Sequence, residues 1–370
     1  MALNSEDSNE DKTMSEVGSK EYYMDILHRL VEQKKAEIFG RDHSGLKIIQ
    51  LSFGRILYKH PNSYGRILQI KYLFDGVPKT KDIFIKFRKK YNLSPDKYME
   101  IYNKFTEEEQ FLPKLYFYIT LEATDETVIG MEYIRGTALR NILFLKVIFG
   151  KTLELKDIFF ENGAKMKLFH SSQREKGKST VGELLTKIRN KLNSSPFFNT
   201  TEKEKIHQHL LNMERDVDPS LKLPLINIHH DWTLRNLIVR EDGKLLVIDL
   251  DSIEWAPAWC WHDVVYFLFN IESQIKYWPF VSVRSLEFLW RQFLRGYFSG
   301  ADSEPITNEL LSKLFYLIKL EHWIDTFSIA KFYNRGLGKL YVKRLKKSLQ
   351  MGHYTIFRRG RSGLSVDEDD

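Results

Sequence analysis

The chain is poor in cysteine, with Cys260 as the single one in 370 residues. A lone cysteine excludes an internal disulfide framework and a zinc site built from cysteines. Long apolar runs are also missing, because the best candidate, "VVYFLFNI", falls far short of the roughly 18 residues that span a bilayer. The polar start, "MALNSEDSNEDKTMSEVGSK", lacks the pattern of a signal peptide. We therefore expect a soluble, cytoplasmic protein with a disordered polar tail over residues 1–22.

Apolar and basic residues are abundant in their place. The composition is 43% hydrophobic and 14% aromatic, which is ample for a packed core. The net charge of +7 is uneven, since residues 331–366 carry ten Lys and Arg and no acid. Such a stretch suits an anionic acceptor, an anionic membrane surface in peripheral contact, or nucleic acid, and it is equally compatible with a solvated helix face. We expect it to lie near the acceptor side of a functional site.

Hydrophobic patterning divides the chain into two parts. Short apolar runs over 46–58, 65–74 and 81–87, separated by turn formers, predict an antiparallel meander. A helical stretch over 93–118, with Pro113 as a candidate break, and a buried strand over 126–136 follow. Helical patterns dominate after Thr137, apart from a hairpin over 236–250 that turns at Asp242-Gly243. The predicted class is α+β, with a small antiparallel-sheet lobe over 23–135, a larger mainly helical lobe over 136–352, and a tail over 353–370.

The hairpin carries a group of acidic and amide side chains. Asp231 and Asn236 bracket the loop before its first strand, and Asp249 ends the second strand, so a tight turn brings them to one edge. Two carboxylates and an amide oxygen suit a hard cation such as Mg²⁺. Asp251 would face the same side if the strand continued. The histidines at 229 and 230 have no further His or Cys at zinc-ligand spacing nearby, which disfavours zinc.

The segment "HHDWTLRN" has the order His-x-Asp-x-x-x-x-Asn and precedes an aspartate on the next strand. In kinases that order places an aspartate at the attacking hydroxyl and an asparagine and a second aspartate at the metal. The chain thereby resembles the aminoglycoside phosphotransferase and choline kinase superfamily of small-molecule kinases, over roughly residues 45–300. Its motifs are most similar to those of predicted phosphotransferases of bacterial surface-polysaccharide gene clusters. The resemblance implies a bilobal protein-kinase-like fold that uses ATP and Mg²⁺.

The same resemblance implies a nucleotide-binding set in the first lobe. Lys86 in "DIFIKF" corresponds to the strand lysine that holds the α- and β-phosphates. A glutamate from "TEEEQFLPKL" should pair with it, and Glu108 is preferred over its two glutamate neighbours at 107 and 109 on the spacing of the leucines that follow. Backbone groups from Glu132 to Ile134 would meet the adenine.

Three departures from the superfamily pattern stand out, one of which is "DLD" at 249–251 in place of the commoner Asp-Trp-Glu. The turn "KHPNSYGR" has one glycine, Gly65, in place of a glycine-rich loop, so the phosphate grip there would depend on Asn62 and Ser63. His230 occupies a position that is usually glycine, which leaves the backbone of the loop in question. No Ala-Pro-Glu motif follows Asp249, and its absence argues against a protein kinase.

The function predicted from the sequence is transfer of phosphate from ATP to a hydroxyl of a small molecule or glycan, such as a sugar, an amino alcohol or a surface-polysaccharide precursor. Asp231 would act as the base, while Asn236, Asp249 and Asp251 would hold the metal. The alternatives are an inactive kinase-fold binding protein and a nucleic-acid-binding protein.

Several nearby residues admit a purely structural interpretation. Asp263 would cap the helix that it opens, and His170 would be a helix-end or core histidine. The tryptophans at 255, 259 and 261 would either stack on a sugar or belong to the core.

Overall fold

The computed structural model describes residues 20–40, 42–60, 63–89, 99–100, 102–103, 105, 111–250, 257–273, 283–299, 308–326 and 337–351. The chain divides into two compact units, Met1–Arg135 and Gly136–Asp370. No helix in the described part of the chain is long and apolar enough to cross a membrane.

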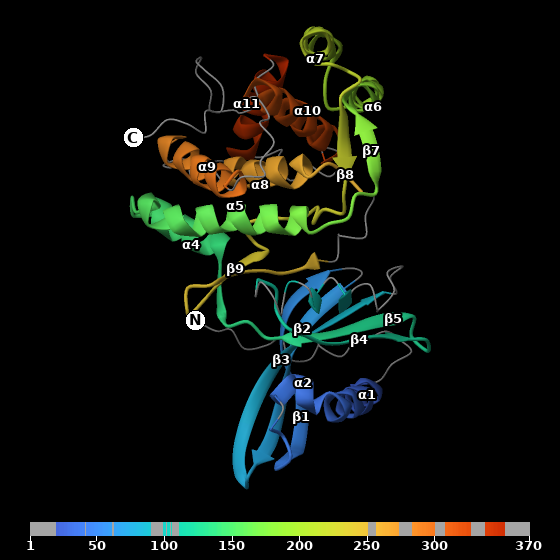
Figure 1. Ribbon diagram of the computed structural model, residues 1–370, viewed down its shortest axis with the longest axis vertical. Helices are drawn as coiled ribbons and strands as arrows, with labels where there is room; N and C mark the ends of the chain where they lie inside the picture. The colour runs from blue at the N-terminus through green and yellow to red at the C-terminus, as the bar shows by residue number, and fades with distance from the viewer. Residues whose placement is uncertain are drawn as a thin grey trace. The chain divides into compact units, whose positions relative to one another are not determined.

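Unit 1 is built on one antiparallel sheet of five strands in the order β1-β2-β3-β5-β4 (Figure 1). Its elements are α1 (Lys20–Gln33), α2 (Lys35–Phe39), β1 (Leu46–His60), β2 (Ser63–Phe74), β3 (Val77–Lys89), β4 (Leu115–Leu121) and β5 (Glu126–Glu132). The first three strands pair consecutively, which confirms the predicted meander. Asp75, at φ 50°, and Gly76, at φ 80°, form the turn between β2 and β3, and both adopt the left-handed conformation that such turns need.

Helix α1 covers the core of unit 1 and was missed by the sequence interpretation. Tyr23, Leu27 and Val31 recur at intervals of four residues, so they share one face, and all three are buried in the core of the unit. Tyr23 donates a hydrogen bond to Glu126 of β5 and meets Phe87 of β3 edge to face. The helix therefore begins at Lys20, inside the segment predicted to be a polar tail.

Strand β4 corrects a second expectation, since residues up to 118 were predicted to be helical. The residues Leu115–Leu121 instead pair antiparallel with β5. The sequence "LYFYITL" is rich in aromatic and β-branched residues, which favour a strand, and Pro113 prevents a helix from continuing into it. Leu115 to Tyr118 are all buried, so their pattern lacks the alternation that would have marked a strand.

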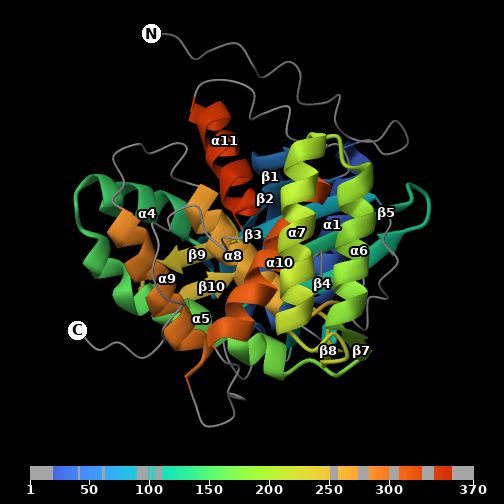
Figure 2. The same cartoon turned by 90° about the horizontal axis from the view of Figure 1, so that it is seen from above.

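Unit 2 is mainly helical, as predicted, and the class α+β with a small antiparallel sheet is confirmed. Its elements are β6 (Gly136–Ala138), α4 (Leu139–Ile148), η3 (Thr152–Leu155), α5 (Lys156–Ser171), β7 (Gly177–Thr180), α6 (Val181–Ser194), α7 (Thr200–Asp216), β8 (Lys222–Leu225), β9 (Leu237–Arg240), β10 (Leu245–Val247), α8 (Trp261–Ser273), α9 (Val283–Tyr297), α10 (Asn308–Thr326) and α11 (Leu337–Gln350). Helix α5 packs against α9, and α10 packs against both α6 and α8 (Figure 2).

The predicted hairpin is present as β9 and β10, which pair antiparallel from Leu237–Val247 to Val239–Leu245. Two features of it differ from expectation. The strand β6 adds to β9, and β10 ends at Val247, so Asp249 lies beyond the strand and does not end it. A separate pair, β7 with β8, was not predicted, because each strand has four residues and they are distant in sequence.

Helices α5 and α9 approach closely through two glycines. A Cβ atom on Gly163 would overlap the carbonyl oxygen of Phe293, and one on Gly296 would overlap the carbonyl oxygen of Phe160. Because the obstructing atoms are backbone, a methyl group fits only if one helix moves. The crossing matters for function because α5 carries His170 and α9 carries Tyr297, which lie in the site described below.

We predict that Gly163→Ala lowers the stability of the protein by about 1–3 kcal/mol, the usual cost of overpacking. Helix propensity alone would favour alanine over glycine, so the sign of the change separates the two effects. Thermal and urea unfolding would measure it, with Ser171→Ala, an exposed small residue on the same helix, as the control. A Gly163→Ala variant as stable as the wild type would contradict the close crossing.

Candidate active site

Asp231 and Asn236 are in direct contact, as the hairpin geometry predicted. The side-chain nitrogen of Asn236 donates to the Asp231 carboxylate at 2.8 Å and to the Asp231 carbonyl at 3.0 Å. Both residues are half-buried in the loop that precedes β9. The amide nitrogen is thus directed at Asp231, and the Oδ1 oxygen of Asn236 is the atom that can bind a cation.

Ile248 ties this loop to the segment that carries Asp249. Its N–H donates to the carbonyl of Asn236 at 2.9 Å, and its carbonyl lies 3.2 Å from Nε2 of His229. The other ring nitrogen of His229 accepts from the N–H of Asp231 at 3.3 Å. These partners select the neutral tautomer of His229 with its proton on Nε2. The fully buried His229 therefore orders the backbone of the loop.

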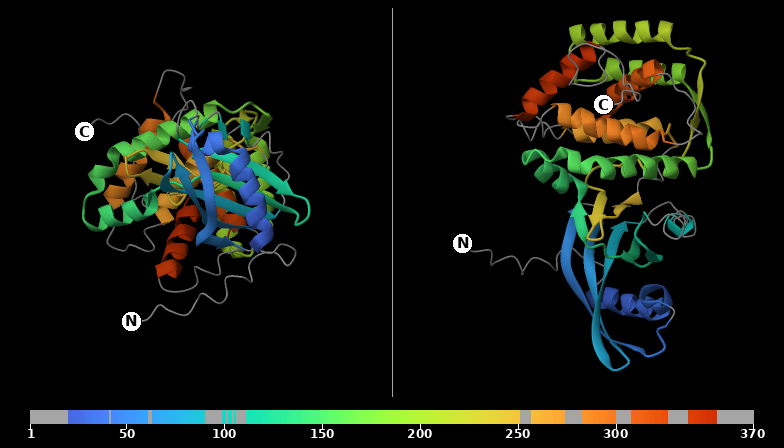
Figure 3. Two further views of the ribbon diagram at one scale, coloured as in Figure 1. Left: turned by 90° about the horizontal axis from the view of Figure 1, so that it is seen from below. Right: turned by 60° about the vertical axis from the view of Figure 1, so that its left-hand side comes forward.

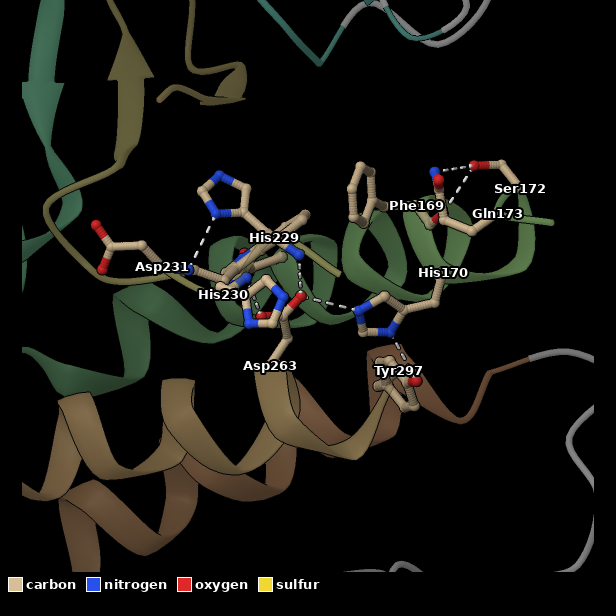
Figure 4. Close-up of polar contacts among 11 residues, drawn as sticks. Phe169, His170, Ser172, Gln173, His229, His230, Asp231, Asp263 and Tyr297 are labelled. Atoms are coloured by element: carbon tan, nitrogen blue, oxygen red, sulfur yellow. Dashed lines mark hydrogen bonds and ion pairs between the residues drawn. The ribbon is translucent and has the colours of Figure 1, made fainter. Parts of the chain in front are cut away.

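The carboxylate of Asp263 holds the start of the loop (Figure 4). One oxygen accepts from the N–H of His229 at 2.7 Å, and the other accepts from the N–H of His230 at 2.8 Å. Asp263 is the third residue of α8 and is completely buried. The expectation that it caps its own helix misses this role, which is to bind backbone 33 and 34 residues earlier in the chain.

His170 completes this group from α5. Its Nε2 lies 3.1 Å from an oxygen of Asp263, and its Nδ1 lies 3.0 Å from the hydroxyl of Tyr297 on α9. Burial opposes the negative charge of Asp263, but the hydrogen bonds from His170 and from the backbone of His229 hold the pKa of Asp263 below its ordinary value. His170 is therefore a support of the loop and not a ligand, in line with its structural interpretation.

A neighbouring buried contact fixes the indole that follows Asp231. The ring nitrogen of Trp232 donates to Oδ1 of Asn162 on α5 at 2.9 Å, and both side chains are fully buried. Further along the loop, Asn270 of α8 accepts from the N–H of Leu234 at 3.0 Å. The loop is thus bound by α5 and α8 on both sides of the catalytic candidate.

Two residues of the site adopt left-handed backbone. His230 has φ 62° and Asp249 has φ 65°. His and Asp are among the non-glycine residues that are enriched in this region, where other side chains are rare. His230 therefore adopts the left-handed conformation that a glycine would adopt there, so the loop backbone forms without the usual glycine.

The pKa of Asp231 is shifted by burial and by the polar and charged groups around it. Burial raises the pKa of Asp231 above the ordinary value, and the negative charge of Asp249 raises it further. The hydrogen bond from Asn236 and the charge of Arg235 act in the opposite direction. A carboxylate with a raised pKa is a stronger base than a free one, which suits removal of a proton from a hydroxyl.

The donor set suits Mg²⁺ better than a transition metal. The described residues contain no group of three or more His, Cys, Asp or Glu that could hold a metal by themselves. Mg²⁺ is usually held by one or two protein oxygens together with phosphate oxygens and water. Asn236 and Asp249 meet that requirement, and they remain predicted ligands.

The nucleotide-binding residues predicted in the first lobe lie in unit 1. Lys86 is buried near the carboxyl-terminal end of β3, with its Nζ 5.7 Å from the ring centre of Tyr58, and its strand neighbour is Gly65. Ser63 opens β2 and is half-buried.

Gly65 does not form a phosphate loop, because it lies within β2. A Cβ there would overlap the rings of Tyr58 and Phe84, so packing explains this glycine.

The linker residues are placed at the end of β5. The N–H of Glu132 donates to the carbonyl of Lys114 at 2.8 Å, so that N–H is bound within unit 1 and does not serve a nucleotide. Ile134 follows the strand and is half-buried. Asn62, Glu108, with both of its glutamate neighbours, Asp251 and Trp255 fall outside the described residues.

For Trp259 and Trp261, the choice between stacking on a sugar and belonging to the core is decided in favour of the core. Trp259 and Trp261 are both buried, at 3% and 6% exposure, so stacking on a sugar is not their role. In the basic stretch, Lys343 and Lys347 of α11 are exposed, but Lys346 binds Glu202 of α7 at 3.1 Å. The stretch is therefore partly neutralised by an acid that lies outside it.

Comparisons with known proteins give structural likeness without sequence matches. No protein-family model matches the chain, and no curated protein matches it. Among solved structures, the chain is similar to an amicoumacin kinase in complex with AMP-PNP and Ca²⁺, at 12% identity and a TM-score of 0.49, covering 88% of this chain and 94% of that one.

Two further solved structures give similar values. The first is a thermostable mutant of an aminoglycoside phosphotransferase with AMP-PNP and hygromycin B, at 11% identity and a TM-score of 0.47, covering 87% and 98% of the chains. The second is an ethanolamine kinase of Plasmodium vivax, at 14% and 0.44, covering 89% and 87%. Identities this low do not assign a substrate or a residue, so the roles proposed below depend on contacts within this chain.

We predict that Asp263→Asn destabilises the protein at neutral pH by about 3 kcal/mol or more, because it removes a buried charge from its hydrogen-bond donors. Because the pKa of Asp263 is lower in the folded protein than in the unfolded chain, its carboxylate stabilises the fold at pH values above the unfolded pKa of about 4. This stabilisation is lost as the pH falls through the lower pKa of the folded protein. The gap between wild type and variant should therefore narrow below about pH 4.

Urea unfolding at a series of pH values would measure this gap, with Asp242→Asn as the control. Asp242 is an exposed carboxylate in the hairpin turn, so its removal should leave stability almost unchanged. A gap between wild type and Asp263→Asn that stays constant down to acid pH would show that the carboxylate charge is not what holds the loop.

Proposed function

We propose that the protein is a phosphotransferase that moves the terminal phosphate of ATP to a hydroxyl group of a small molecule or glycan, with Mg²⁺ as the metal. The single observation that carries this proposal is the contact of Asn236 with Asp231 at 2.8 Å, beside Asp249. This contact supports a base, Asp231, and two oxygen ligands, Asn236 and Asp249, in one small region. That arrangement matches the aspartate, asparagine and aspartate of kinase chemistry.

Asp231 is the proposed base. Its carboxylate would accept a hydrogen bond from the acceptor hydroxyl, orient its oxygen for attack and take its proton as the phosphate is transferred. The hydrogen bond from Asn236 fixes one carboxylate oxygen and leaves the other for the hydroxyl. Since His229 and Asp263 immobilise the backbone on the amino-terminal side, the base is held in place before substrate binds.

Asn236 and Asp249 are the proposed metal ligands, with Asp251 as a third that lies outside the described residues. When bound, Mg²⁺ would neutralise the charge of the phosphates. Lys86 of unit 1 is proposed to bind the α- and β-phosphates, with Glu108 as its partner. A fixed arrangement of charges of this kind is the main source of catalysis in phosphoryl transfer.

The acceptor is proposed to be small because the sequence lacks the Ala-Pro-Glu motif of protein kinases after Asp249. Sugars, amino alcohols and surface-polysaccharide precursors are the classes to test. A screen for acceptor-dependent ADP release would identify the class. The absence of turnover with every acceptor, together with retained binding of nucleotide, would instead indicate a binding protein on the same scaffold.

We predict that Asp231→Asn reduces kcat by about 10²- to 10⁴-fold while the affinity for nucleotide stays close to that of wild type. The reason is that the base acts on the acceptor and not on the phosphates. Acceptor-dependent turnover and calorimetric titration with an ATP analogue would measure the two quantities. A variant with comparable turnover would exclude Asp231 as the base.

We predict a different outcome for Asp249→Asn, which removes a charged ligand from a hard-cation site. The Mg²⁺-dependent affinity for ATP should fall by at least about tenfold, the lower end of what is lost when even a supporting group of a metal ligand is removed. Asparagine tolerates the left-handed φ of this position, so the backbone is conserved. Unchanged affinity in the variant, against an Asp242→Asn control, would argue that Asp249 is not a ligand.

A further inference from the structure

One buried carboxylate of unit 2 has an oxygen that no described residue binds. Glu321, near the end of α10, is 5% exposed. Its Oε1 is bound by the ammonium groups of Lys187 and Lys191 of α6, at 2.7 and 3.1 Å. Its Oε2 is buried and has no hydrogen-bond partner in the described part of the chain. Buried charges are costly unless their hydrogen-bonding positions are filled, so this oxygen indicates a missing donor.

A buried donor lacks a partner in the same part of unit 2. Trp259, which lies two residues before the start of α8, is 3% exposed. Its Nε1–H meets no acceptor among the described residues. Buried indole N–H groups usually have a hydrogen-bond partner. The indole is therefore available to donate through its edge, although its burial excludes stacking of a sugar on its face.

His262 lies beside both of these groups. Its ring centre is 6.4 Å from that of Trp259. Burial lowers the pKa of His262 to about 4, and the negative charge of nearby Glu321 opposes that shift only in part. The ring is therefore neutral at neutral pH, with one nitrogen that donates and one that accepts. His262 is half-buried, so it is the most exposed of the three side chains.

These side chains are close to the catalytic loop. His262 directly precedes Asp263, whose carboxylate accepts from the N–H of His230 at 2.8 Å (Figure 4). His230 is also near enough to His262 to contribute to the shift of its pKa. The next residue of the loop is Asp231, the proposed base. A molecule bound beside His262 would therefore lie near the carboxylate that is proposed to activate its hydroxyl.

The unpartnered atoms indicate the chemistry of the ligand. A hydroxyl group both donates and accepts, so the hydroxyls of one sugar ring can satisfy Oε2 of Glu321 and the N–H of Trp259 together. An ammonium group has no acceptor for the indole, and a phosphate has no donor for the carboxylate. The charges are balanced as well, because Lys187 and Lys191 pair with Glu321 and Asp325. The site therefore offers no net charge to attract a cation or an anion.

We propose that Glu321, Trp259 and His262, which we call the His262 subsite, bind the hydroxyl groups of a neutral polyhydroxylated acceptor such as a sugar. This inference rests on the proposed transfer of phosphate to a hydroxyl and narrows the class of acceptor. Amino alcohols and anionic acceptors fit the subsite less well. A site made of hydrogen-bonding groups discriminates against analogues that lack the hydroxyl, because its buried polar atoms then stay unpaired.

The test is binding of a panel of neutral pentoses and hexoses to the full-length protein, titrated by saturation-transfer NMR without ATP. Ethanolamine and glucose 6-phosphate represent the amine and the anion. The wild type should bind at least one neutral sugar more tightly than either of these. Glu321→Gln should weaken that binding by about tenfold or more, because a hydrogen bond to a charged group is lost. Trp259→Phe, which removes a neutral donor, should weaken it by about two- to tenfold.

Two controls separate the subsite from its surroundings. Lys187→Gln removes an ion pair from Oε1 of Glu321, leaves Oε2 unchanged and should bind sugar like the wild type. Trp290→Phe removes a buried indole N–H from α9 and should also bind normally. The melting temperature of every variant is measured alongside. Because Trp259→Phe keeps an aromatic ring, it tests the subsite even if Glu321→Gln does not fold.

Binding without ATP does not depend on catalysis, so the subsite and the proposed function can fail separately. Sugar binding that is weakened by both substitutions, with no phosphate transfer to any acceptor, would support the subsite and contradict the proposed function. Phosphate transfer to a sugar with an unchanged KM in Glu321→Gln and Trp259→Phe would do the reverse. A wild type that binds no neutral sugar, or that prefers ethanolamine or glucose 6-phosphate, would also overturn the subsite.

Discussion

The carboxylate of Asp263 is the constraint on which the site in unit 2 depends. A charge removed from water is costly unless donors surround it, and here the backbone N–H groups of His229 and His230 and the ring of His170 do so. The loop is bound through its backbone, so the arrangement fixes its direction whatever side chain follows. The left-handed φ of His230 follows this pair of hydrogen bonds and sets the direction in which the backbone continues to Asp231.

A chain of hydrogen bonds connects the backbone held by Asp263 to the catalytic candidates Asp231 and Asn236. His229 joins the N–H of Asp231 to the carbonyl of Ile248, and the N–H of Ile248 returns to the carbonyl of Asn236. Neither Asp231 nor Asn236 needs to be buried deeply, since the backbone beneath them is already fixed. This support of the loop depends on the close crossing of α5 and α9, which brings His170 of α5 to Tyr297 of α9 (Figure 3). Only glycine at 163 and 296 permits that crossing.

Whether an element was predicted correctly depended largely on how far apart in the sequence the residues that specify it lie. The meander of β1 to β3 and the hairpin of β9 and β10 were predictable, because turn residues and apolar runs close in sequence specify them. Helix α1 and strand β4 were not predicted. The pattern of α1 is apolar on one face only, within a very polar neighbourhood, while β4 is buried on both faces and lacks alternation. The pair of β7 with β8 joins residues about 45 positions apart, which no local pattern reveals.

For the candidate site, the sequence by itself determined which residues to consider, Asp231, Asn236 and Asp249. It also determined that they lie near one another, because a hairpin with a tight turn brings its two ends together. It also determined that Lys86 lies on a strand of the small sheet. Only the tertiary structure decided the role of Asp263 and the burial of Trp259 and Trp261, since both depend on helices far apart in sequence. Composition counts apolar residues, but the packing of the other elements decides which of them are covered.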